Sequence, residues 1–225
     1  MPASPIPRPA AVLFDMDGTL VDTEHLWWQS AAELAEELDL TLTDRDLPEV
    51  LGRAVEHTAA HLHRVSGTGR AEQELVERLN ESFSRKVAAE VVPRPGALAL
   101  LAALQAAEVP TALVSASPRR VVELVLGSIG RQWFTVTLAA EDTERTKPDP
   151  APYLAAAERL GLDPAACVAV EDTPTGVASA HAAGCAVLAV PSTVPIPAAE
   201  RITLLESLEL ADLGLLAGLT AARAV

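Results

Sequence analysis

Two aspartates stand two positions apart directly after a short apolar segment, in the run Asp15-Met16-Asp17-Gly18-Thr19. Carboxylates at the end of a buried strand are costly unless a cation binds there. Asp15 could therefore serve as a metal ligand and as a nucleophile that forms an aspartyl phosphate. Asp17 could protonate a leaving alkoxide and later take a proton from water, and Gly18 would let the backbone approach a phosphate closely. A turn that contains acidic residues would explain either aspartate alone.

A second acidic pair, Glu171 and Asp172, follows the apolar run at 168–170 and precedes Thr173-Pro174. Mg²⁺ prefers hard oxygen ligands in an octahedral shell, which water and a substrate phosphate can complete. We expect Asp172 to bind such a metal directly, and Glu171 to bind it directly or through water. The alternative is that both acids only stabilise the positive end of the helix that follows.

Phosphate contacts are predicted after a second apolar segment and around one lysine. Ser115 and Ala116 stand where a hydroxyl and backbone N–H groups at a helix start would favour an anion. Lys147 is one of only two lysines in the chain, and its compact charge could neutralise both phosphoryl oxygens and the Asp15 carboxylate. Thr19 joins these predicted phosphate contacts. Taken singly, a helix cap would explain Ser115 and a surface position would explain Lys147.

The candidate residues fall at the ends of short apolar segments that alternate with Ala- and Leu-rich helical segments. This βαβ rhythm predicts an α/β fold with a parallel sheet covered by helices on both faces. Ligands of such sheets bind beyond the carboxyl ends of the strands, so Asp15, Ser115 and Asp172 should lie together. The predicted strands are 10–15, 110–115, 135–138, 167–170 and 186–190.

The chain from Trp27 to about Ala89 is polar and helix-forming and contains no good strand candidate, which predicts an all-helical insert. Its longest predicted helical stretch is 70–90. Elsewhere, Ser117 and Thr173 are predicted helix N-caps, because each is followed by a proline suited to the first helical position.

Composition narrows the classes of protein and of partner. The chain has 225 residues, 49% of them hydrophobic, which suffices for one sizeable core and a smaller accessory domain. The formal net charge, 17 − 31 = −14, argues against nucleic acid and anionic membrane surfaces as partners. The Pro-rich start lacks the apolar core of a signal peptide, and Cys167 and Cys185 are expected to be buried, reduced thiols, so we expect a cytoplasmic protein. Apolar stretches at 96–118 and 173–199 are predicted to be helix–strand pairs and not membrane spans.

Four motifs resemble, in order and spacing, those of the haloacid dehalogenase superfamily, in its phosphatase and phosphomutase branch. They are DMDGTLVDTE, VSASP, TKPDPAPYL and VEDTPTGVASAHAAG. The resemblance implies a Rossmann-like core of residues 1–21 and 93–225 and an inserted helical cap domain of residues 22–92. It also implies Mg²⁺ as cofactor and a small phosphorylated metabolite as substrate, and it leaves the oligomeric state open. Thr146 departs from the small residue that commonly precedes the motif lysine, which puts the geometry of that loop in question.

The functional roles of the family carry over to positions where this sequence matches its motifs. The resemblance implies a nucleophile, an acid/base group, two phosphate contacts and a metal site. These roles would fall to Asp15 as nucleophile, to Asp17 as acid/base and backbone-carbonyl Mg²⁺ ligand, to Ser115 and Lys147 at the phosphate, and to Asp172 with Glu171 at the metal.

Other activities on this fold stay open at this stage. Dehalogenases of the superfamily lack the second aspartate and need no Mg²⁺, so Asp17 argues against that chemistry. Phosphonate-cleaving relatives use a cap lysine, and the cap offers only Lys86 at the end of its last helix. Sugar phosphomutases resembling β-phosphoglucomutase typically carry a histidine where this chain has Trp27, with His25 out of phase, which favours hydrolysis. A non-catalytic phosphate-binding regulatory protein is disfavoured because Asp15 and Asp17 are both present.

The cap would select the substrate by closing on its leaving group. Arg53, beside Gly52, is the candidate specificity residue because caps of the family tend to present a substrate-reading loop there, although solvent exposure explains an arginine equally well. His57 and His61 have helical spacing but no acidic residue between them as in a zincin motif, so we interpret them as a polar helix face. Trp27 and its neighbour Trp28 could line the cleft, but packing between cap and core is the expected role.

Overall fold

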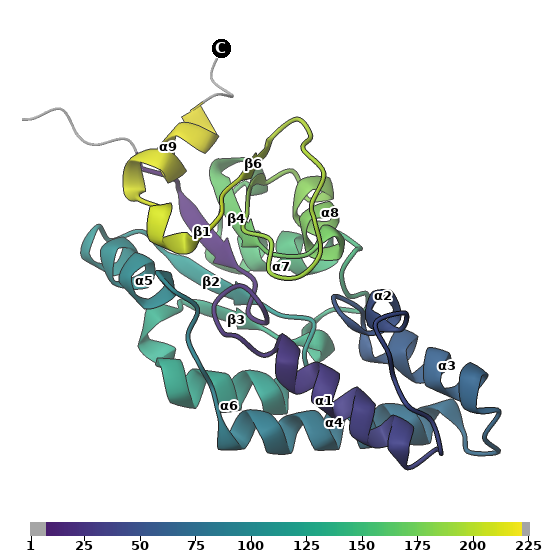
Figure 1. Cartoon of the computed structure of the whole chain (residues 1–225). Helices are drawn as coiled ribbons and strands as arrows, with labels where there is room; N and C mark the ends of the chain where they lie inside the picture. The colour runs from purple at the N-terminus through teal and green to yellow at the C-terminus, as the bar shows by residue number, and fades with distance from the viewer. Residues whose placement is uncertain (1–7, 222–225) are drawn as a thin grey trace, which may run out of the picture.

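The computed structural model describes residues 8–221, whose strands form one six-stranded parallel sheet (Figure 1). The spatial order is β3-β2-β1-β4-β5-β6, so β1 lies in the interior of the sheet, between β2 and β4. Phe14 at the end of β1 pairs with Leu113 of β2 and with Val170 of β4. This register brings the chain that follows these three strands to one edge of the sheet. The strands are β1 Ala11–Phe14, β2 Thr111–Val114, β3 Val136–Leu138, β4 Cys167–Glu171, β5 Ala186–Ala189 and β6 Ile202–Leu204.

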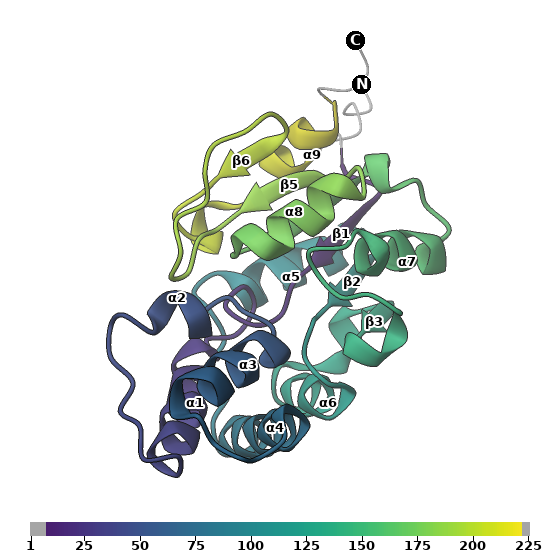
Figure 2. The ribbon, with the colours of Figure 1, turned by 90° about the vertical axis from the view of Figure 1, so that its right-hand side faces the viewer.

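Helices cover both faces of the sheet because successive strand residues point to opposite sides (Figure 2). Val12 and Phe14 of β1 belong to one apolar cluster, and Ala11 and Leu13 to another, and all four side chains are fully buried. The first cluster is completed by α5 Ala97–Ala106, α6 Arg119–Ile129 and α9 Leu213–Ala221, and the second by α7 Ala151–Leu160 and α8 Pro174–Ala182. Short 3₁₀ turns lie at Arg131–Trp133, Ala140–Asp142, Pro164–Ala166 and Leu208–Leu210.

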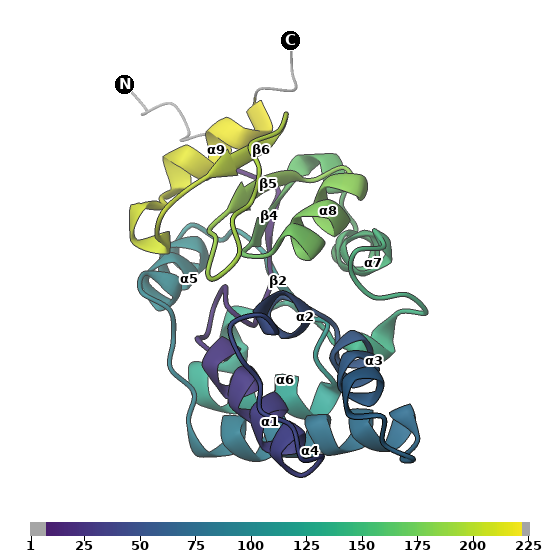
Figure 3. The ribbon, with the colours of Figure 1, turned by 45° about the vertical axis from the view of Figure 1, so that its right-hand side comes forward.

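Four further helices stand between β1 and α5 and lie beyond the carboxyl edge of the sheet (Figure 3). They pack on one another through an apolar cluster of their own, which contains Leu34, Leu62, Leu75 and Leu79. These helices are α1 Glu24–Glu36, α2 Leu47–Val50, α3 Val55–Ser66 and α4 Glu72–Ala89, and no strand interrupts them within the described residues.

The two chain segments that connect these helices to the sheet run side by side. The backbone N–H of Asp22 donates to the carbonyl of Val92 at 2.8 Å, and the N–H of Arg94 donates to the carbonyl of Leu20 at 2.8 Å. Val21 and Pro93 form an antiparallel bridge between the two hydrogen bonds. The helices therefore leave and rejoin the core at one point, a few residues after Asp17.

The predicted strands are confirmed to within one residue at their ends. The stretches 96–118 and 173–199 each contain a helix followed by a strand, as predicted, although the strands end at Val114 and Ala189. Strand β6 was not predicted, because three partly exposed residues at the edge of a sheet carry little apolar pattern. Among residues 8–221, no helix combines the length and the apolar character that a membrane crossing requires. Cys167 and Cys185 are buried, as expected, and no disulfide joins them.

One of the two predicted N-caps is wrong. Thr173 does cap α8, since its Oγ1 accepts from the N–H of Gly176 at 3.1 Å. Ser117 does not cap α6, because that helix begins only at Arg119, after an extended Pro118. The Ser117 hydroxyl instead donates to Asp17 Oδ2 at 2.8 Å. A charged acceptor beside the serine therefore replaces the helix N–H groups as its partner.

Candidate active site

Three buried carboxylates meet beyond the ends of β1 and β4. One oxygen from each of Asp15, Glu171 and Asp172 lies within 4.8 Å of the other two. Asp15 Oδ2 is completely enclosed and has no hydrogen-bond partner among the described residues. An enclosed carboxylate oxygen without a donor is costly, and a cation would relieve that cost. Oxygen donors at this spacing suit Mg²⁺, so the residues fit the metal that the sequence predicts.

Burial and the crowding of negative charge raise the pKa values of two acids in this cluster. Burial, and then the nearby Asp15, raise the pKa of Glu171 to about 7, against the opposing pull of Lys147. Burial, and then Asp15 and Glu171, raise the pKa of Asp172 well above its ordinary value. Perturbation of this size by burial and like charge is typical of functional sites, and a bound divalent cation would oppose it.

Gly18 makes the close approach of the two acidic segments possible. Its φ is +80°, and a Cβ at this position would lie 2.0 Å from Asp172 Oδ2. The Asp172 carboxylate therefore occupies the space where a side chain at position 18 would stand. Only glycine allows the two segments to lie so close together. The neighbouring Thr19 donates from Oγ1 to Asp172 Oδ1 at 3.1 Å, so its hydroxyl is turned toward the carboxylate cluster.

Lys147 supplies the positive charge between two of the acids. Its Nζ lies 2.5 Å from Asp15 Oδ1 and 2.6 Å from Glu171 Oε1, and its side chain is only 6% exposed. Burial alone would lower the pKa of Lys147, but the two carboxylates outweigh burial and raise that pKa above its ordinary value. Lys147 is thus a charged ammonium held against Asp15.

Tyr153 was not singled out from the sequence and completes this arrangement. Its hydroxyl donates to Glu171 Oε1 at 2.5 Å, and Lys147 Nζ lies 5.2 Å from the centre of its ring. A cation over an aromatic face is favourable, so one fully buried side chain supports both charged neighbours. A signal was present, because Tyr153 is the single tyrosine of the chain and stands six residues after Lys147.

Replacing Lys147 with methionine should lower the free energy of unfolding by about 3–5 kcal/mol, since removal of one partner leaves buried charge uncompensated. Lys147 lowers the pKa of Glu171, so that pKa rises further in the variant. A carboxyl whose pKa is raised by folding costs stability as the pH rises from its unfolded pKa to its folded pKa. The parent and the variant share this cost up to the parent's Glu171 pKa of about 7, so the extra loss in the variant should grow above about pH 7. Urea unfolding at pH values below and above about 7, without added metal, measures both effects.

The other lysine is a matched control for this substitution. Lys86 pairs with Glu33 at 2.6 Å, but its side chain is 19% exposed and that of Glu33 is 53% exposed. Lys86→Met should cost only about 0–1 kcal/mol, because exposed ion pairs contribute little. Equal losses for the two variants would contradict the assignment of Lys147 as the compensating charge of the buried acids.

Asp17 is held by three hydroxyl groups from separate segments. Thr23 Oγ1 donates to Oδ1 at 2.7 Å, while Ser117 Oγ at 2.8 Å and Ser115 Oγ at 3.3 Å donate to Oδ2. Burial, and then the charge of Asp15, raise the pKa of Asp17, and the hydroxyl groups oppose this rise. Asp17 therefore has a fixed orientation and a raised proton affinity, which suit a group that gives and takes a proton.

The carboxylates open onto a cavity of about 150 Å³ between the sheet edge and the helices α1–α4. Asp15, Asp17, Lys147 and Asp172 line it from the core side, together with Ala116. Three predicted phosphate contacts do not line this cavity, namely Gly18, Thr19 and Ser115. The hydroxyl of Ser115 donates to Asp17, and that of Thr19 donates to Asp172. The side chains that line it from the helical side include Glu24, Trp27, Arg53, Asn80 and Phe83.

Arg53 reaches the cavity from the loop between α2 and α3, and its Nε donates to the carbonyl of Pro48 at 2.9 Å. Trp27 is packed edge-on against Phe83, with ring centres 5.4 Å apart, and its Nε1 donates to the carbonyl of Val50 at 2.9 Å. Trp27 thus both lines the cavity and packs, whereas Trp28 packs only against the cluster of the four helices.

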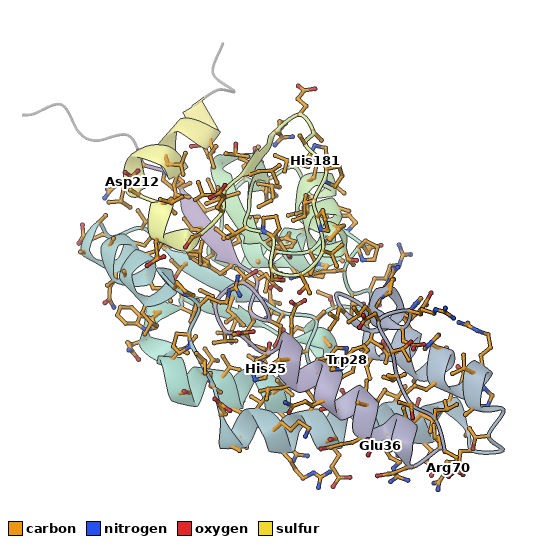
Figure 4. All side chains as sticks on the ribbon, in the orientation of Figure 1. His25, Trp28, Glu36, Arg70, His181 and Asp212 are labelled. Carbon is orange, nitrogen blue, oxygen red and sulfur yellow. The ribbon has the colours of Figure 1, made fainter. Side chains whose placement is uncertain are left out.

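The histidines of α1 and α3 lie outside the cavity. His25, labelled on α1 with Trp28 in Figure 4, is exposed and lies 3.6 Å from Asp22. The interpretation of His57 and His61 as one polar helix face is half wrong. His57 is exposed, but the side chain of His61 is only 8% exposed and pairs with Asp46 at 3.0 Å. The pairing of α3 with the start of α2 buries His61, and the spacing within α3 alone could not reveal it.

A family model described as haloacid dehalogenase-like hydrolase matches residues 12–190. The chain is 35% identical over 206 residues to hexitol phosphatase A of Escherichia coli strain K12, covering 88% of this chain and 90% of that protein. It is 32% identical to validoxylamine A 7'-phosphate phosphatase of Streptomyces hygroscopicus subsp. limoneus, covering 76% of this chain and 81% of that protein. The structure of CbbY from Rhodobacter sphaeroides in complex with phosphate matches with a TM-score of 0.79 and 26% identity, over 90% of this chain and 96% of that one. By its motifs, its sheet and these matches, the chain belongs to the haloacid dehalogenase-like hydrolase family.

Proposed function

We propose that this protein is a Mg²⁺-dependent phosphatase that hydrolyses a small phosphate monoester through an aspartyl phosphate on Asp15. The observation that carries the proposal is the enclosed Asp15 Oδ2, which has no donor among the described residues and belongs to a carboxylate at the floor of the cavity. Asp17 and Lys147 line the same cavity, as a proton-transfer group and a fixed cation. The similarity to two proteins named as phosphatases supports the same reaction.

In the first step the Asp15 carboxylate attacks phosphorus in line with the departing alcohol, so the bond between a carboxylate oxygen of Asp15 and phosphorus forms as the ester bond breaks. Asp17 gives its proton to the leaving oxygen. Lys147 and the backbone N–H groups at Ala116 hold the phosphoryl oxygens, and Ser115, which was expected to do so, donates to Asp17 instead. Mg²⁺, held by Asp15, Asp172, Glu171 and the backbone carbonyl of Asp17, would supply positive charge that neutralises the phosphoryl group.

In the second step the proton returns to Asp17. This carboxylate takes a proton from water, which attacks the phosphorus of the aspartyl phosphate. The bond between Asp15 and phosphorus breaks, inorganic phosphate leaves, and both carboxyl groups regain their starting states. The three hydroxyl groups around Asp17 hold it in one orientation for both proton transfers.

The helices α1–α4 act in this proposal as a cap of residues 22–92 on a core of residues 1–21 and 93–225. The paired connecting segments at Val21 and Pro93, and the position of the cavity between the two parts, support this division. Closure of the cap would exclude water while the ester bond breaks. We also place the enzyme in the cytoplasm, where two buried cysteines stay reduced.

The leaving group that the cap receives is small and carries hydroxyl groups. Glu24 and Asn80 line the cavity and can form hydrogen bonds with the hydroxyl groups of a substrate. Arg53, which also lines the cavity, is the proposed specificity residue. Trp27 occupies the position where resembling phosphomutases carry histidine, and its indole N–H is engaged by Val50. Without a proton-transfer group at this position, water is favoured over a sugar hydroxyl as phosphoryl acceptor.

A phosphate-release screen tests the proposal. The panel contains hexitol phosphates, sugar phosphates, phosphoglycolate and nucleoside monophosphates, with conversion of glucose 1-phosphate to glucose 6-phosphate followed in parallel. We expect phosphate release from at least one hydroxyl-bearing ester, loss of activity to background with EDTA, and recovery with added Mg²⁺. Activity that survives chelation would contradict the metal, isomerisation without phosphate release would indicate a mutase, and binding of phosphate without any turnover would indicate a regulatory protein.

A further inference from the structure

The loop between β5 and β6 reaches the metal side of the site, although none of its residues belongs to the four motifs. Ser192 Oγ donates to Asp172 Oδ2 at 2.5 Å, and Thr19 Oγ1 donates to the other oxygen, Oδ1, at 3.1 Å. Each oxygen of Asp172 thus has one hydroxyl donor. Such donors fix the orientation of a carboxylate and leave lone pairs for a metal, since each ionised oxygen accepts more than one bond.

The same loop also meets the helices α1–α4 (Figures 2 and 3). Glu24, the first residue of α1, lies near Ser192, whose hydroxyl lowers the pKa of the Glu24 carboxyl while burial raises it more strongly. Two residues further on, Val194 Cγ2 lies 4.0 Å from the position that a Cβ on Gly52 would occupy. Gly52 precedes Arg53 in the loop between α2 and α3. The β5–β6 loop therefore lies where the metal ligands and both cap segments come together.

We propose that Ser192 is a positioning residue that holds Asp172 in place for Mg²⁺. The inference rests on the proposed function, because it assumes that Asp172 binds the metal. A hydroxyl carries one proton, and Ser192 gives it to Asp172.

Calorimetric titration with Mg²⁺ on the metal-free protein tests this proposal. Ser192→Ala should raise the Mg²⁺ dissociation constant by about 10–100-fold, the effect expected when a hydrogen-bond partner of a metal ligand is lost. At saturating Mg²⁺ the variant should keep a kcat within a few-fold of the parent. Ser192→Thr, which retains a hydroxyl, should restore most of the affinity. Ser128→Ala, at an exposed position on α6, is the matched control and should leave the affinity unchanged.

Parent-like Mg²⁺ affinity in Ser192→Ala, in a variant that circular dichroism shows to be folded, would overturn the positioning role while leaving the proposed function intact. A parent protein that binds no Mg²⁺ would overturn both.

Discussion

Replacing Asp15 with asparagine should lower kcat for phosphate ester hydrolysis by at least about 10⁴-fold, because an amide is not a nucleophile towards phosphorus. The substitution keeps the shape of the side chain and changes the oxygen Oδ2, which the fold leaves enclosed and without a donor among the described residues. Steady-state phosphate release gives the rate. Acid quenching with a labelled substrate should trap an acyl phosphate in the parent, sensitive to hydroxylamine, and none in Asp15→Asn.

The same chemical change at an exposed position separates catalysis from general damage. Asp44 lies exposed in the segment between α1 and α2, away from the cavity. Asp44→Asn should retain the parent kcat and the trapped intermediate. If Asp15→Asn kept a kcat within ten-fold of the parent, or still accumulated a labelled acyl phosphate, Asp15 would not be the nucleophile.

Replacing Asp17 with asparagine should lower kcat for an alkyl phosphate by about 10²–10⁴-fold, because the leaving alkoxide then departs without a proton. An aryl phosphate needs no such proton, so its first step should stay fast. Hydrolysis of the aspartyl phosphate still needs a base, and the variant should therefore release one equivalent of phenolate in a rapid burst and then turn over slowly. Stopped-flow absorbance with p-nitrophenyl phosphate measures the burst and the steady rate.

Asp22→Asn is the control for this variant, since the Asp22 side chain is 47% exposed and pairs only loosely with His25 at 3.6 Å. It should show the parent rates with both kinds of ester. A burst that is slowed as strongly as the steady rate, in Asp17→Asn with the aryl ester, would indicate that Asp17 maintains the site and does not transfer protons.

The carboxylate cluster could be predicted from the sequence because it depends on one geometric rule. Parallel neighbouring strands end at the same edge of a sheet, and the apolar runs before Asp15 and Asp172 identify two such strands. Their pairing through Phe14 and Val170 brings the acids together. Lys147 could be predicted for a different reason, since a rare residue type in a motif carries more information than one of many arginines.

The hydrogen bonds that orient these groups could not be predicted in the same way. Ser117, Tyr153 and Ser192 each contact an acid far away in sequence, and that contact depends on how a helix or loop packs and not on any local pattern. A serine before proline has a familiar local role as a cap, which made the interpretation of Ser117 wrong. Burial of His61 likewise depends on the packing of α2 against α3.

The pairing of the two connecting segments at Val21 and Pro93 has a consequence for how folds of this kind diversify. Its two hydrogen bonds, Asp22 to Val92 and Arg94 to Leu20, join the ends of the 22–92 stretch as a hairpin would. Since loop length changes closure entropy only slowly, a much shorter or much longer segment could be exchanged at this junction without disturbing strand order. Substrate preference can thus evolve by replacement of a whole module, while the phosphoryl chemistry beneath it is inherited unchanged.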